Sequence, residues 1–110
     1  MNPARFWQAV DEYLKETSVS LSWLNINLGF RDGYLKMMKR KNSIPSSKKL
    51  MKFKNILSDD ILYEVITSRA ESTKDAETVR LIDDFMLSLN ISDEMRGKQR
   101  LKRKLMRQRL

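Results

Sequence analysis

The sequence predicts an all-α protein, and three observations support this class. Apolar residues recur every three or four positions in successive segments, which is the spacing of one helix face. Residues that favour helix starts, namely Asn2, Ser20 and Ser58, precede several of these segments. Gly29 stands where a short helix would end, and glycine adopts the left-handed conformation of such a position without strain. The length of 110 residues favours one domain, and the apolar content of 41% is enough for a modest core.

The first predicted helix begins at Pro3, a residue that is tolerated in the first turn of a helix. Its inner face consists of residues four positions apart: Phe6, Val10 and Leu14. Trp7 and Trp23 lie beside apolar stripes, so we expect both indoles to pack in the core or at its edge. The alternative is that they stack on a ligand.

Residues 20–45 predict two short helices joined by a tight turn at Gly29. The first would run from about 21 to 28, and the Ser20 hydroxyl would accept a hydrogen bond from its first turn. The second would run from about 32 to 40. Their inward-facing residues are Leu24 and Leu28 in the first helix and Leu35 and Met38 in the second.

Two further helices complete the first part of the chain. Pro45, with two serines after it, predicts the start of a fourth helix, whose apolar positions are Leu50, Phe53 and Leu57. Ser58 then predicts the cap of a fifth helix, and Asp59 and Asp60 would lie favourably in its positive first turn. The apolar residues of this helix are Ile61, Leu62, Val65 and Ile66.

A C-terminal extension follows a polar connection at residues 67–75. We expect a helix over about residues 73–89, with one apolar stripe formed by Val79, Ile82, Phe85, Met86 and Leu89. Such a stripe must be buried against another surface. It could fold back on the first part of the chain, but we predict that it dimerises. The expected division is therefore an N-terminal domain at 1–68 and a helical extension at 69–110.

Positive charge is concentrated in two blocks. Residues 31–54 contain nine basic residues and one acid, and residues 96–110 contain eight basic residues and no acid, whereas the rest of the chain carries a net charge of −8. This segregation suits a polyanionic partner, because each Lys or Arg placed at a phosphate releases counterions.

The basic tail at residues 92–110 has too few apolar residues for a normal core. It is expected to add contacts with DNA or RNA, becoming helical on binding. Three alternatives remain open at the level of the sequence: a helix on anionic lipid, a segment that binds an acidic protein, and a solvated tail that only raises solubility.

The spacing of residues 20–57 resembles the lambda-repressor-like helix-turn-helix family, which includes the phage repressor, Cro and Xre-type domains. Seven positions fall into register without a gap: Ser20, Leu24, Gly29, Leu35, Met38, Pro45 and Leu57. With the helix ahead of Ser20, the resemblance covers roughly residues 5 to 66. It implies a five-helix DNA-binding domain that often acts as a homodimer and places its second short helix in the major groove of double-stranded DNA.

The resemblance assigns DNA-binding positions to Ser20, Leu21, Ser22, Arg31, Asp32, Gly33, Tyr34, Lys36, Met37, Lys39, Arg40, Lys41, Asn42 and Ser43. The base-reading positions would be Asp32, Gly33 and Met37, which offer few of the bidentate amide or guanidinium contacts that discriminate base edges. Two alternatives follow: the specificity is modest, or it depends on DNA shape. Asp32 could equally cap the helix.

The family usually pairs an Arg in its first helix with a Glu at the end of the recognition helix, but Leu14 and Lys39 occupy these positions here. Because both members differ, neither leaves a buried charge unpaired. We expect Leu14 to pack on the Lys39 stem while the ammonium reaches solvent or phosphate.

Composition argues against an enzyme. The chain contains no histidine and no cysteine, which removes the usual general base, thiolate nucleophiles and the commonest zinc ligands. The pairs Asp59–Asp60 and Asp83–Asp84 are adjacent in sequence, so on a helix their carboxylates diverge by about 100°. No cofactor or metal is expected. No apolar run approaches a membrane span and no secretory signal opens the chain, so a cytoplasmic protein is expected.

The sequence thus predicts a sequence-specific DNA-binding transcription regulator, and the resemblance implies a repressor of phage or mobile-element type. The alternative is an adaptor that uses the same scaffold, or its basic tail, to bind another protein or nonspecific nucleic acid.

Overall fold

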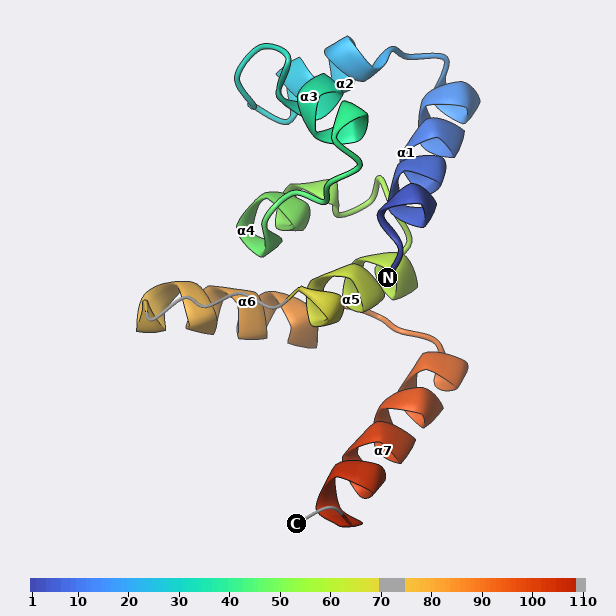
Figure 1. Cartoon of the computed structure of the whole chain (residues 1–110), viewed down its shortest axis with the longest axis vertical. Helices are drawn as coiled ribbons and strands as arrows, with labels where there is room; N and C mark the ends of the chain where they lie inside the picture. Colours follow the sequence, from blue (N-terminus) through green and yellow to red (C-terminus); the bar gives the residue numbers. More distant parts are fainter. Residues whose placement is uncertain (70–74, 109–110) are drawn as a thin grey trace.

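The computed structural model describes residues 1–69 and 75–108, and within these ranges the chain is all-helical (Figure 1). The elements are α1 (Pro3–Thr17), α2 (Leu21–Asn27), α3 (Tyr34–Arg40), α4 (Ser47–Leu50), the 3-10 helix η1 (Met51–Phe53), α5 (Asp59–Ser68), α6 (Ala76–Ser88) and α7 (Asp93–Gln108). The predicted fold class is therefore confirmed at the all-α level. The predicted start of the sixth helix at 73 lies outside the described residues, and its first described helical residue is Ala76.

Helix starts follow the capping residues that the sequence predicted. The Asn2 side chain accepts a hydrogen bond from the Ala4 N–H at 2.9 Å, ahead of Pro3. The Ser20 and Ser58 hydroxyls accept from the third residue of α2 and α5, at 3.0 and 3.3 Å. Each cap satisfies a backbone donor that a helix leaves unpaired in its first turn.

Helix α3, the second of the two short helices expected in residues 20–45, starts two residues later than predicted. Gly33 is its N-cap residue, with a left-handed φ of 75°, and this backbone conformation separates Asp32 from the helix. The prediction that Asp32 could cap the helix is therefore wrong. Gly29 also has a positive φ, 76°, as predicted for the residue that ends the first short helix.

The fourth helix is shorter than its apolar spacing suggested. α4 ends after one turn and continues as η1, and Asn55 then adopts a left-handed φ of 72°. The prediction of helix as far as Leu57 is therefore wrong, because this conformation cannot continue a right-handed helix. The apolar residues nevertheless point inward, since Leu50, Phe53 and Leu57 are all buried.

The core lies between α1 and the helices from α2 to α5. Its fully buried side chains include Phe6, Val10, Leu24, Leu35, Leu50, Phe53, Leu62 and Val65. The Phe6 ring makes edge contacts with Trp7 and Phe53, at centroid distances of 4.9 and 5.7 Å. Trp7 is buried as expected, but Trp23 is 46% exposed, so the prediction of core or core-edge packing is wrong for this second indole.

Helix α6 turns most of its apolar stripe toward the core of its own chain. Leu89 is buried, and Ile82, Phe85 and Met86 pack against the core, whereas Val79 remains exposed. The sequence left open whether the stripe packs on its own chain or dimerises. Four of the five residues assigned to dimerisation thus pack on their own chain. Of these, only Leu89 is buried, and Ile82, Phe85 and Met86 remain partly exposed.

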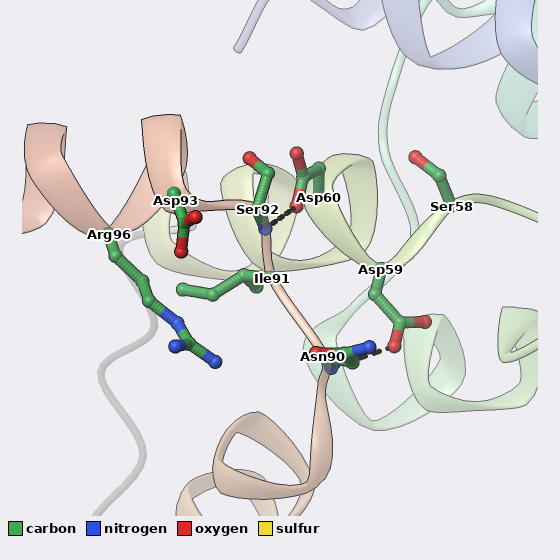
Figure 2. A pocket seen from close by; sticks show the side chains of 8 residues that line it. All are labelled: Ser58, Asp59, Asp60, Asn90, Ile91, Ser92, Asp93 and Arg96. Atoms are coloured by element: carbon green, nitrogen blue, oxygen red, sulfur yellow. Dashed lines mark hydrogen bonds between the residues drawn. The ribbon is translucent and has the colours of Figure 1, made fainter.

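The connection between α6 and α7 is held by two aspartates from the start of α5 (Figure 2). The Asp59 carboxylate accepts from the Asn90 N–H at 2.9 Å and from the Lys54 ammonium at 2.7 Å. Asp60 accepts from the Ser92 N–H at 2.8 Å. These hydrogen bonds lower the pKa of both carboxyls, the largest contributions coming from Lys54 for Asp59 and from Ser92 for Asp60.

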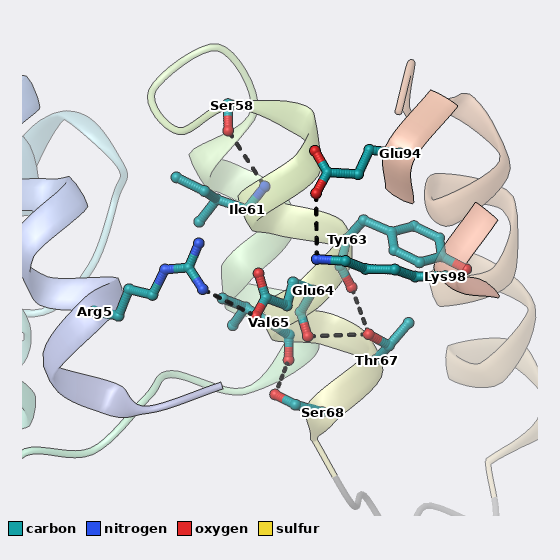
Figure 3. A network of polar contacts seen from close by, with 10 residues as sticks. All are labelled: Arg5, Ser58, Ile61, Tyr63, Glu64, Val65, Thr67, Ser68, Glu94 and Lys98. Atoms are coloured by element: carbon teal, nitrogen blue, oxygen red, sulfur yellow. Dashed lines mark hydrogen bonds and ion pairs between the residues drawn. The ribbon is translucent and has the colours of Figure 1, made fainter. Parts of the chain in front are cut away.

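Polar contacts on α5 link it to α1 (Figure 3). Arg5 of α1 forms an ion pair with Glu64 at 3.4 Å. Helix α7 carries its own pair between Glu94 and Lys98, at 3.7 Å, and beyond its first turns it extends away from the other helices (Figure 1). None of the helices in the described parts of the chain is long and apolar enough to span a membrane.

Candidate nucleic-acid interface

The turn between α2 and α3 is organised by the buried side chain of Asn25. Its amide nitrogen donates to the carbonyl oxygens of Phe30 and Arg31, at 3.5 and 2.8 Å. Its carbonyl oxygen accepts from the Leu35 N–H at 2.9 Å. One side chain of α2 therefore fixes both the turn and the first turn of α3, which otherwise has no side-chain cap.

A lysine from η1 braces the same turn from outside. The Lys52 ammonium donates to the carbonyl oxygen of Leu28 at 3.0 Å and lies 5.3 Å from the centre of the Phe30 ring. A Cβ atom added at Gly29 would lie 3.6 Å from this ammonium, which is ordinary contact. The glycine is therefore required by its positive φ and not by crowding.

Helix α3 has a buried face and an exposed face. Leu35 is fully buried and Met38 packs against the core, as predicted. Lys36 and Arg40 are exposed, and Lys41 follows them at the exposed end of the helix. These three cations, which we call the α3 basic row, are available to a partner that approaches the solvent side of α3.

Two predicted contact residues of α3 are less available than the resemblance implies. Tyr34 is buried, with its ring 5.1 Å from that of Phe30 and the Lys49 ammonium 4.6 Å from its centre. Met37 is half-buried and packs against the core. Tyr34, one of the DNA-binding positions that the resemblance assigns, therefore has its ring in the packing of the domain.

Lys39 forms an ion pair instead of extending freely. Its ammonium contacts both carboxylate oxygens of Asp11 in α1, at 2.7 and 3.0 Å. The Lys39 side chain is 41% exposed, so it reaches solvent as predicted while its ammonium pairs with Asp11. Leu14, the other position of the altered family pair, is half-buried and packs against the core.

The loop after α3 is anchored from α1. The indole N–H of Trp7 donates to the Ser43 carbonyl oxygen at 3.0 Å, and the Ser43 N–H donates to Met38 at 3.0 Å. Asn42 is exposed and has a left-handed φ of 52°, which asparagine tolerates better than most residues. The loop is thus held against the core while Lys41 and Asn42 remain exposed.

The other predicted positions lie before α3. Ser22, Arg31, Asp32 and Gly33 are exposed, and Leu21 is half-buried against the core. The Ser20 hydroxyl is occupied as the cap of α2. Of the three predicted base-reading positions, Asp32 and Gly33 therefore remain exposed and Met37 is partly covered.

Three residues of this site were not predicted from the spacing of the sequence: Asn25, Lys49 and Lys52. Asn25 lies between Leu24 and Ile26 in a seven-residue helix, and nothing in the spacing signals a buried amide. The two lysines belong to the basic block at residues 31–54, in which composition does not distinguish one lysine from another. In the described residues, no group of three or more His, Cys, Asp or Glu side chains is placed to hold a metal ion.

The fold and this surface define an all-α protein in which two short helices are fixed around a buried asparagine. Its sequence matches, over residues 1–110, the family described as Domain of unknown function (DUF7339), and the chain belongs to that family. Neither the curated proteins nor the solved structures gave a match.

Proposed function

We propose that this protein is a sequence-specific DNA-binding transcription regulator of the lambda-repressor-like type. The proposed partner is double-stranded DNA, with α3 in the major groove. One observation carries the proposal: the α3 basic row of Lys36, Arg40 and Lys41 lies on the exposed side of a helix whose other side is fixed in the core.

The rigidity of α3 supports this proposal. A recognition element must present its side chains in a fixed register, and Asn25 ties α2, the turn and α3 together through three hydrogen bonds. The basic row would contact phosphates, which position a protein on the duplex without reading its sequence. Direct readout would come from Asp32 and the backbone at Gly33, supplemented by the shape of the DNA.

Repression and a phage or mobile-element origin are also part of the proposal. They are supported only by the resemblance of residues 20–57 to the lambda-repressor-like family. A homodimer is part of the same proposal. Several apolar side chains of α6 and α7 are exposed and could support self-association: Val79, Leu81, Leu87, Leu101 and Leu105. A two-fold dimer would recognise inverted half-sites about 34 Å apart.

The test is selection of binding sites from a random duplex pool with the full chain and with a version that ends at Met95. An enriched inverted repeat that the shorter protein retains would support readout by α3. If no motif emerges and binding disappears with residues 96–110, the regulator proposal fails and a nonspecific polyanion binder replaces it.

Charge reversal provides the matched comparison. The triple variant Lys36→Glu, Arg40→Glu and Lys41→Glu should lose duplex binding while its circular dichroism spectrum is unchanged. The single variant Lys36→Glu should also bind the duplex more weakly than Lys15→Glu, which changes the net charge by the same amount on the exposed side of α1. Equal binding by these two single variants would contradict the use of α3.

The second candidate function is a protein-binding adaptor. It is favoured by the apolar side chains on the C-terminal helices, above all Leu87, which is 86% exposed. Leu101 and Leu105 lie four residues apart on α7 and therefore share one side of it. The double variant Leu87→Ser and Leu101→Ser tests this surface. If the variant binds DNA normally and its self-association is also unchanged, the surface does not support the adaptor function.

A further inference from the structure

A cleft beside the α2–α3 turn gathers four cations and no acid. Its volume is about 590 Å³, and it is lined by Gly29, Phe30, Arg31, Tyr34, Lys48, Lys49 and Lys52. The side chains come from the turn, from the first residue of α3 and from the α4–η1 segment. This lysine cleft is distinct from the α3 basic row, with which it shares no residue.

Two of the ammonium groups are held in place by aromatic rings. Lys49 lies 4.6 Å from the centre of the Tyr34 ring, and Lys52 lies 5.3 Å from that of Phe30. Lys52 also donates to the Leu28 carbonyl oxygen. The negative face of an aromatic ring attracts a cation, so these lysines are positioned before any ligand arrives. A positioned charge loses less conformational entropy on binding than a free lysine.

The gathered charges also repel one another. Lys49 and Lys52 are three residues apart and Lys48 and Lys52 four apart, a spacing at which like charges on a helical segment destabilise it. Lys48 has an acidic neighbour, Asp75, whose pKa is lowered mainly by the Thr78 hydroxyl and the Glu77 N–H and only slightly by Lys48. Lys48 therefore adds to the positive charge that Arg31, Lys49 and Lys52 bring to the cleft.

We propose that the lysine cleft is a binding site for closely spaced phosphate groups. Lysine binds phosphate as a point charge, and the Arg31 guanidinium can contact two phosphate oxygens at once. The cleft volume falls in the range of small-molecule sites, so it could receive a short phosphate chain. The same chemistry could come from a free polyphosphorylated compound or from the backbone of a nucleic acid. The proposal does not depend on DNA reading by α3.

The experiment is calorimetric titration of the full chain with sodium tripolyphosphate and, in a parallel arm, with a short DNA duplex. The cleft variant Lys49→Gln with Lys52→Gln should weaken tripolyphosphate binding by at least about tenfold, since hydrogen bonds to charged groups are among the stronger ones. The matched control, Lys15→Gln with Arg80→Gln, removes the same charge from exposed positions of α1 and α6, outside both basic blocks, and should change the affinity by less than about twofold.

The two arms distinguish the source of the phosphate. A loss confined to the cleft variant in the tripolyphosphate arm supports a free compound. If tripolyphosphate does not bind but the cleft variant alone loses affinity for the duplex, the phosphates belong to nucleic acid and the site is still supported. Equal losses in the cleft and control variants, or no loss in either arm, would overturn the proposal, because diffuse charge would then explain all binding.

Folding is checked separately because Lys52 braces the turn. If circular dichroism shows that the double variant is unfolded, Lys49→Gln alone retains the Lys52–Leu28 hydrogen bond and should still weaken binding about threefold or more. Amide resonances of Gly29 and Arg31 should shift with tripolyphosphate, whereas that of Gly97 in α7 should not. The triple charge reversal on the α3 basic row should lose duplex binding but keep tripolyphosphate binding. Failure of the proposed DNA-binding function can therefore be distinguished from failure of the lysine cleft.

Discussion

The side-chain oxygen of Asn25 accepts a hydrogen bond from the backbone N–H of Leu35, ten residues later, at 2.9 Å. Asn25 is buried, and its amide nitrogen is paired with the turn that precedes α3. The orientation of α3 thus depends on a polar group in the interior, where an unpaired donor or acceptor would be costly.

Replacing this asparagine should therefore destabilise the fold strongly. Asn25→Ala leaves the Leu35 N–H and the Arg31 carbonyl oxygen without their partner, and we expect a loss of about 2–4 kcal/mol in the free energy of unfolding measured in urea. Asn27→Ala is the matched control, because Asn27 makes an exposed hydrogen bond to Trp23 in the same helix. Equal losses for the two variants would contradict the special role of Asn25.

Gly33 should resist replacement by any residue with a Cβ. Its φ is 75°, and no atom lies within 4 Å of an added Cβ, so the cost of Gly33→Ala is backbone strain of about 1–2 kcal/mol. Gly33→Asn should cost less, because asparagine tolerates this conformation better. Thermal unfolding measures both effects. Gly97→Ala provides the opposite case, since it should raise the helical circular dichroism signal of α7.

Acid should weaken the attachment of the α6–α7 connection. The pKa values of Asp59 and Asp60 lie below the ordinary 3.8 in the folded chain. The unfolded chain therefore binds protons more readily, so the stabilisation is present above about pH 4 and is lost as the pH falls through the folded pKa values. Urea unfolding at a series of pH values should show this decline.

A double variant tests the origin of that decline. Asp59→Asn with Asp60→Asn should be less stable at neutral pH and should show a flatter dependence below pH 4. Asp84→Asn, on the exposed side of α6, should retain the wild-type dependence. An identical pH profile in the double variant would show that other carboxyls cause the decline.

Salt dependence should reveal phosphate contacts by the α3 basic row. Each contact removed, for example by Lys36→Ala or Arg40→Ala, should reduce the slope of log affinity against log salt concentration by about 0.9 for duplex DNA. Lys15→Ala should leave the slope unchanged. Unaltered slopes in all three variants would show that the row does not touch phosphate.

The sequence was a good guide wherever structure depends on local signals. Asn2, Ser20 and Ser58 cap helices as expected, because a cap requires only neighbouring residues. Apolar spacing also identified the buried residues of α1 and α5, since a helix face is set by its period.

The sequence did not predict contacts between residues that are far apart along the chain. The pairing of Lys39 with Asp11 depends on how α1 and α3 pack, and no spacing within either helix reveals it. The same is true of Asp59 and Asp60, which looked like ordinary helix-start charges but bind the backbone of residues 90 and 92. For the candidate site, exposure of Lys36 and Arg40 agrees with expectation, whereas the inward position of Tyr34 depends on its contact with Phe30.

The bond from Lys52 to Leu28 has a consequence for genetics. A screen for inactive alleles would recover changes at position 52 even if its side chain met no partner molecule, because the loop it braces carries the neighbouring helix. Suppressor alleles should then arise within this protein, at positions 28–30, and not in the partner that the protein recognises.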